Sequence, residues 1–343
     1  MEIELVSHLC SRFPAHPQMK LGPGDDAAIL ELAGTRPEIV VSTDLLTEGV
    51  DYLLARMNPR KIGRKALAAN LSDLAAMAAK PLACVISVAI PKLPVFPNSK
   101  DLSPDEIFLP KNRKPHGKSI PELMELLCEG FLDAVSEIPI AIAGGDTNTW
   151  DGPLVLSVTV LGEVAGKPLC RHEAKPGDAI LVTGPLGGSI LRHQFECTPR
   201  TDEMLRLNEA FKLHAGMDIS DGLTLDLSRL CRRSQCGAEL FLDEIPISDA
   251  ARELSELKPE KSKIYDWIPA GFASGSPLDH ALGDGEDFEV LFTAGWKESE
   301  KILRNTFGIP VWRIGRITDE EGIYGLRGNG TRELLPVRGF EHS

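Results

Sequence analysis

The segment Ile140-Ala141-Ile142-Ala143-Gly144-Gly145-Asp146-Thr147-Asn148 combines a small apolar run, two glycines and a carboxylate. Its four small apolar residues predict a short buried strand, and the two glycines then allow a tight turn or close approach to a ligand. Asp146 follows at once, at the C-terminal end of the predicted strand. A carboxylate at a strand end beside glycine makes this segment the first candidate for a functional site.

The same pattern, an apolar segment that ends in acidic residues, recurs along the chain. It is found in the segments Ile39–Asp44 and Met217–Gly222, and the turn Gly22–Asp26 adds a pair of acids. Carboxylates gathered in one place repel one another unless cations lie between them, and hard oxygen ligands favour Mg²⁺. The pattern therefore predicts a shared acidic centre in a Mg²⁺-dependent phosphoryl-transfer enzyme.

Composition limits the class of protein. The 343 residues suffice for about two domains, and 43% hydrophobic with 25% charged residues is ordinary for a globular protein. The formal charge of −13 argues against a nucleic-acid partner, which needs a basic face. It leaves anionic substrates open, because a bound metal reverses the local sign.

Location is predicted from cysteines and apolar runs. The seven cysteines include no C-x-x-C pair, which favours free thiols in a cytoplasmic protein. The N-terminus has no signal-peptide pattern. No apolar run reaches the ~18 residues of a membrane span, so no membrane partner is expected.

Strands and helices alternate in both halves, which predicts an α/β protein with domains 1–165 and 166–343. The clearest helix is 62–79, and Asp73 is the only ionisable residue between Ala66 and Ala79. A buried lone carboxylate needs a metal or a hydrogen-bonding partner, and both alternatives stay open. A second helix is expected over 218–230, capped by Ser220 or Asp221.

Two segments each allow two interpretations. The insertion at about 91–121 is rich in proline and basic residues, and is either a mobile flap near a nucleotide entrance or a surface loop. The turn Gly184–Ser189 either binds an anion or is structural, since it lacks the P-loop pattern.

Short motifs over nearly the whole chain occur in the order of a known family. They are Gly24–Ala28, Ser42–Asp44, Glu48–Val50, Asn70–Met77, Gly144–Thr147, Leu161–Val164, Arg171, Pro176–Asp178, Thr183-Gly184, Asp218–Leu223, Gly285–Asp287 and Ile314–Arg316. The sequence resembles the thiamine-monophosphate kinases of the aminoimidazole ribonucleotide synthetase (PurM-like) superfamily. The resemblance implies ATP-dependent phosphorylation of thiamine monophosphate to thiamine diphosphate with several Mg²⁺ ions. It also implies a homodimer whose N-terminal sheets join into a barrel, with ATP and Mg²⁺ bound by the N-terminal domain.

The resemblance also implies site residues. The metal ligands fall on Asp26, Ser42, Thr43, Asp44, Asp73, Asp146, Asp218 and Asp221. ATP contacts fall on Gly145, Asp146, Arg171 and Ser220, with Asp146 and Arg171 in the catalytic roles. Substrate contacts fall on Asp51, Glu286 and Phe340. The planar guanidinium of Arg171 suits phosphate oxygens.

Two positions depart from the family pattern. Asp51 stands where the family usually has a substrate-contacting His, and Cys128 stands about where it often has an aromatic residue near the nucleotide. A carboxylate beside the substrate phosphate would be repelled. We therefore expect Asp51 to face the aminopyrimidine or thiazolium, with a solvent-facing Asp51 as the alternative. Other readings are an aminoimidazole ribonucleotide synthetase-like enzyme and a non-catalytic nucleotide-binding paralogue.

Overall fold

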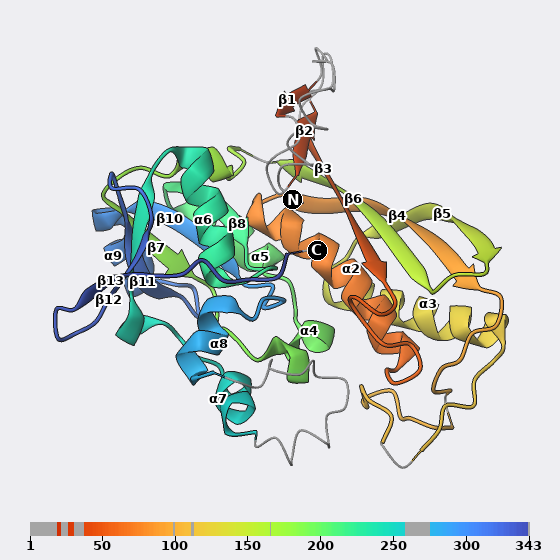
Figure 1. Cartoon of the computed structure of the whole chain (residues 1–343). Coiled ribbons are helices and arrows are strands. Elements are labelled where there is room, and N and C mark those ends of the chain that lie inside the picture. Colours follow the sequence, from red (N-terminus) through yellow and green to blue (C-terminus); the bar gives the residue numbers. More distant parts are fainter. Residues whose placement is uncertain are drawn as a thin grey trace.

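The computed structural model describes residues 19–21, 27–30, 38–98, 100–110, 113–164, 166–257 and 275–341. Two mixed β-sheets, each packed against helices, form two α/β domains (Figure 1). The strands of the first sheet lie within residues 19–164, and those of the second lie within 178–334. The domain boundary predicted near residue 165 falls between these two sets of strands and stays a proposal.

The N-terminal sheet has six strands in the order β1-β2-β3-β6-β4-β5. Their bounds are β1 Met19–Leu21, β2 Ala28–Leu30, β3 Glu38–Thr47, β6 Val155–Val164, β4 Lys80–Pro91 and β5 Ala141–Trp150. All neighbours are antiparallel except β4 and β5, which are parallel. Along β6 every second residue is buried, because that face packs against helices.

Helices α2 (Pro59–Ala76) and α3 (Ile120–Glu137) cover this face of the sheet (Figure 1). Of the 18 residues of α2, 15 are buried, so it is an interior helix that also contacts the C-terminal domain. The two helices pack closely at glycine. A Cβ at Gly63 would stand 2.3 Å from the Leu127 carbonyl oxygen, so a side chain there would push the helices apart.

The C-terminal sheet has seven strands in the order β13-β12-β9-β11-β7-β10-β8. Their bounds are β13 Arg332–Leu334, β12 Ile323–Leu326, β9 Gly237–Phe241, β11 Trp312–Thr318, β7 Asp178–Val182, β10 Val290–Gly295 and β8 Leu213–Asp218. Only β12 and β9 run parallel. Every residue of β7 is buried, because helices cover both faces of the sheet.

The helical segments of this domain frame the sheet. They are η1 Arg171–Glu173, η2 Ser189–Leu191, α4 His193–Glu196, α5 Thr201–Ala210, α6 Leu223–Ser234, η3 Leu242–Glu244, α7 Asp249–Glu256, α8 Pro277–Gly283 and α9 Trp296–Arg304. Within the described ranges, none of the helices is both long and apolar enough to cross a bilayer.

Two local predictions are wrong. The strand predicted to be buried, β5, is exposed at all ten residues, because it is an edge strand of the N-terminal sheet. It also continues through Gly144 and Gly145 to Trp150, so Asp146 lies within the strand and not at its C-terminal end. Helix α6 has Gly222 at its N-cap rather than Ser220 or Asp221. The Asp226 carboxylate accepts the N–H groups of Asp221 and Gly222 at 2.9 and 3.0 Å, which satisfies helix-entry donors from inside the helix.

The proline-rich insertion is anchored to the N-terminal end of α2. Phe96, Ile107 and Leu109 are buried, and the Asn58 side-chain amide donates to the carbonyl oxygens of Ser103 and Glu106 at 3.2 and 2.9 Å. None of the described residues of the insertion lines the large cavity between the two domains. This packing favours the surface-loop reading over the flap reading.

Candidate active site

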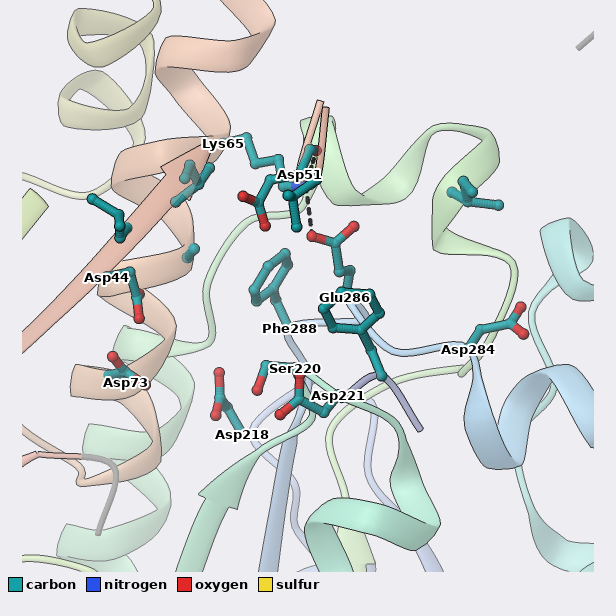
Figure 2. Close-up of a pocket in the computed structure, with 16 residues that line it drawn as sticks. Asp44, Asp51, Lys65, Asp73, Asp218, Ser220, Asp221, Asp284, Glu286 and Phe288 are labelled. Carbon is teal, nitrogen blue, oxygen red and sulfur yellow. Dashed lines mark hydrogen bonds and ion pairs between the residues drawn. The ribbon is translucent and has the colours of Figure 1, made fainter. Parts of the chain in front are cut away.

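A cavity of about 580 Å³ lies between the two domains (Figure 2). Its walls come from the end of β3 and the turn after it, from α2, from the loop between β8 and α6, and from the 284–288 loop. Figure 2 shows two chemically different ends. Asp44, Asp73, Asp218, Ser220 and Asp221 gather at one end, and Asp51, Lys65 and Glu286 at the other, with Phe288 between them.

The acidic end is held together by α2. The Ser42 hydroxyl donates to Asp73 Oδ2 at 2.5 Å, which ties β3 to the helix. One residue earlier, the Ser72 hydroxyl donates to Asp218 Oδ2 at 2.8 Å, which ties the end of β8 to the same turn of α2. The Asp44 amide donates to Asn70 Oδ1 at 3.1 Å. A single turn of α2 therefore aligns carboxylates from both domains.

Arginine supplies part of the counter-charge. Arg229 pairs with Asp221, and with Asp226 at 2.9 Å. Burial, together with the nearby Asp221, raises the pKa of Asp226 to about 7. Several carboxylates therefore lie close together beside Arg229, an arrangement that suits a cation-binding site.

The donor set fits Mg²⁺ shared with a phosphorylated ligand. In the described part of the chain, no three His, Cys, Asp or Glu side chains form a ready-made cage. Mg²⁺ usually keeps several waters and is held by one or two carboxylates plus substrate phosphates, so no such cage is required. The carboxylates that face the cavity and could hold it are Asp44, Asp73, Asp218 and Asp221.

The other end combines carboxylates with aromatic rings. Glu286 and Phe288 have left-handed backbones, with φ of 54° and 48°, which is unusual for side chains of this size and is found at functional sites. Their amides donate to the carbonyl oxygens of Ser220 and Ile219 at 2.6 and 2.9 Å, which holds the loop against the entry of α6. Phe340, whose amide donates to the Asp221 carbonyl oxygen at 2.9 Å, adds a second ring to the cavity wall.

Charges at this end are unevenly compensated. Burial raises the pKa of Glu286, and the ammonium of Lys65, 2.5 Å away, opposes that rise. The Asp51 carboxylate accepts the Thr47 amide at 2.6 Å and also lines the cavity. Aromatic faces with nearby carboxylates suit a flat organic cation.

The glycine-rich turn binds carboxylates of the protein itself. The Gly187 amide donates to Asp287 Oδ1, and the Gly188 amide to Asp284 Oδ2, both at 2.9 Å. These amides are therefore used internally, which favours the structural reading of the turn.

Not all predicted site residues meet in the cavity. Gly145 and Asp146 lie on β5, separated from β3 by β4 and β6, which amounts to about 14 Å at the usual strand spacing. Asp146 pairs in register with Ser87, itself opposite Ser157, and these residues line a small hollow on the sheet face turned away from α2. Thr43 faces the same side and bonds to Thr159 at 2.9 Å.

Arg171 is in η1 and does not line the cavity, although its charge acts on Asp226 and Arg229 beside the acidic end. Asp26 lies outside the described residues. The cavity residues Lys65 and Phe288 were not among the predicted site residues. The available signal for Lys65 was its place directly before the apolar run of the helix.

Family models place this architecture in a known class. Residues 24–164 match the N-terminal domain of AIR synthase related proteins, and residues 175–326 match the C-terminal domain. The chain is thus an AIR synthase related protein. Within that class, the chain belongs to the thiamine-monophosphate kinase family. It is 34% identical to the thiamine-monophosphate kinase of Rhodopirellula baltica, over 100% of this chain and 97% of the relative.

Solved structures of related proteins have the same fold as this chain. A thiamine-monophosphate kinase from Stenotrophomonas maltophilia is 32% identical with a TM-score of 0.64, covering 94% of this chain and 95% of that one. AaThiL complexed with AMPPCP and TMP superposes with a TM-score of 0.72 at 22% identity, covering 100% and 96%. The Escherichia coli hydrogenase maturation protein HypE has a TM-score of 0.64 at 17% identity, covering 99% of each chain, and shares the fold alone.

Proposed function

We propose that the protein transfers the terminal phosphoryl group of ATP to thiamine monophosphate, forming thiamine diphosphate with the help of Mg²⁺. The observation that carries this proposal is the two-ended cavity, in which an acidic end adjoins an end with carboxylates and aromatic rings. Thiamine monophosphate has the matching polarity, an anionic phosphate and a cationic thiazolium. The names of the relatives and the AMPPCP and TMP complex of AaThiL support the same substrates.

The chemistry needs charge neutralisation and alignment more than proton transfer. The accepting phosphate oxygen is already anionic, so no general base is required. Mg²⁺ held by Asp44, Asp73, Asp218 and Asp221 would supply charge neutralisation. Ser42 and Ser72 keep two of these carboxylates in place by their hydrogen bonds.

The opposite end orients the acceptor. Glu286 offsets the positive thiazolium, while Phe288 and Phe340 offer ring faces to it. Binding energy from this non-reacting part of the substrate helps to hold the phosphate in line. The ammonium of Lys65 is already paired with Glu286, so it is not the cation that meets the phosphates.

A homodimer completes the site in this proposal. The edge strand β5 is exposed along its length, and among the described residues β2 pairs with Ile39–Val41 of β3. Within that part of the chain, the segment of β3 that carries Asp44 extends beyond the pairing with β2, which leaves room for a second chain. Exposed edges of this kind are normally covered. We propose that β5 of each chain brings Asp146 to the cavity of its partner, as the two sheets join into a barrel.

The test of function is a coupled assay of ATP consumption with thiamine monophosphate. We expect Mg²⁺-dependent turnover with this acceptor and none with thiamine, which lacks the accepting phosphate. Other phosphorylated acceptors serve as comparisons. Turnover with one of these and none with thiamine monophosphate would assign the chain to another reaction of its class. The cytoplasmic location and the lack of a nucleic-acid partner remain predictions.

Asp51→Asn tests which part of the substrate lies near Asp51. The amide oxygen still accepts the Thr47 N–H, so the turn persists while the charge is lost. We expect the KM for thiamine monophosphate to rise about tenfold, the scale of one charged hydrogen bond, with the KM for ATP unchanged. Unchanged constants for both would mean that Asp51 serves the turn only. A lower KM for thiamine monophosphate would mean that Asp51 selects against it.

A further inference from the structure

Lys65 is a buried lysine at the centre of α2 with only 1% of its side chain exposed. Its ammonium reaches three acceptors: Glu286 Oε1 at 2.5 Å, Gln194 Oε1 at 2.6 Å and the Asp51 carbonyl oxygen at 2.9 Å. A lysine ammonium has three N–H donors, so these contacts use all of them. The Phe195 ring lies 5.2 Å from the same nitrogen.

The three acceptors come from separate parts of the fold. Asp51 belongs to the turn after β3 in the N-terminal domain, Gln194 to α4, and Glu286 to the 284–288 loop of the C-terminal domain. A buried cation is costly unless it is paired and fully hydrogen-bonded, so the three segments are held in one arrangement around Lys65. Figure 2 shows Lys65, Asp51 and Glu286 together at one end of the cavity.

Glu286 depends on this contact for its place. It stands on a left-handed backbone, and 35% of its side chain is exposed within the open cavity. The other acids that act on it, Asp51 and Asp221, are repulsive. Lys65 is therefore the contact that draws the Glu286 carboxylate toward α2.

We propose that Lys65 is a positioning residue that sets the place of the Glu286 carboxylate and so determines how the organic cation of the acceptor is bound. The role rests on the proposed function, because Glu286 acts on thiamine monophosphate only if that is the substrate. Lys65 touches neither reacting phosphate in this scheme. Its influence is on acceptor binding, and ATP binding does not depend on it.

The experiment compares Lys65→Met with Glu286→Gln and the double variant. We expect Lys65→Met to raise the KM for thiamine monophosphate about tenfold or more, with a smaller change in kcat and an unchanged KM for ATP. If the two residues act as one unit, the KM of the double variant for thiamine monophosphate is no higher than that of Glu286→Gln alone. The proposal would be overturned if Lys65→Met raised the KM values for thiamine monophosphate and ATP equally. It would also be overturned if the effects of the two single substitutions on the KM for thiamine monophosphate were additive in the double variant.

Lys61→Met is the matched control. Lys61 lies one turn away on α2, pairs with Glu196 at 3.2 Å and does not line the cavity. We expect it to leave both KM values unchanged. If Lys65→Met is unstable because Glu286 is left beside other acids, the double variant removes that charge as well and should fold.

A structural readout separates failure of this proposal from failure of the proposed function. Absence of turnover with thiamine monophosphate in the unmodified protein would refute the function alone. A crystal structure of the Lys65→Met variant tests the positioning role whatever the substrate is. We expect the Glu286 carboxylate to leave its position near α2, and an unmoved Glu286 would refute the role of Lys65.

Discussion

Asp73→Asn is expected to lower kcat by two or more orders of magnitude while the chain stays folded. Asp73 faces the acidic end of the cavity from α2, between carboxylates contributed by the two domains. The amide keeps an oxygen that can accept the Ser42 hydroxyl, so local packing is preserved. It removes the charge that a shared Mg²⁺ needs, and losses of this size are usual when catalytic electrostatics are removed.

The measurement is kcat at saturating substrates over a range of Mg²⁺ concentrations, with a thermal melt to verify folding. We also expect half-maximal activity to require more Mg²⁺ in the variant. Asp133→Asn is the control, since Asp133 is a helix carboxylate paired with Arg60 at 2.6 Å and lies outside the cavity. It should leave kcat unchanged. Normal turnover of Asp73→Asn at ordinary Mg²⁺ would refute the shared metal centre.

Asp146→Asn is expected to have an effect of the same size, and a mixture of two inactive variants is expected to regain activity. Asp146 is on the sheet face opposite the cavity of its own chain, yet the family resemblance makes it a metal and ATP ligand. If it serves the partner chain, a dimer of one Asp73→Asn and one Asp146→Asn chain contains one intact site. Random exchange makes about half of the dimers mixed, and each mixed dimer has one intact site of two. The mixture is therefore expected to have about a quarter of full activity.

The outcome distinguishes two arrangements. If each chain used its own Asp146, both sites of the mixed dimer would be defective and the mixture would stay inactive. The variants are exchanged by co-expression, and light scattering at micromolar concentration reports the assembly. A fully active monomer would refute both the dimer and the contribution of Asp146 from the partner.

Much of the candidate site was predictable from local sequence. A carboxylate at the end of an apolar segment is a local pattern, and Asp44, Asp73, Asp218 and Asp221 were all found in this way or through the motif order. The apolar character of α2 predicted an interior helix, because a helix that is apolar on all sides is stable only when it is buried. These features depend on neighbours in sequence, so they can be read without the fold.

Three other features depended on the tertiary structure. The apolar run at β5 predicted burial, but the strand lies at a sheet edge, and strand order depends on pairing between distant segments. Asp146 and Asp44 end similar segments, yet their strands are separated by two others and their side chains face opposite sides of the sheet. Lys65 gained its partners Asp51, Gln194 and Glu286 only when three segments met around α2. The local sequence shows which side chains are charged or apolar and therefore need an ion-pair partner or burial. Which partner each one contacts depends on long-range packing, because the partners come from segments distant in the sequence.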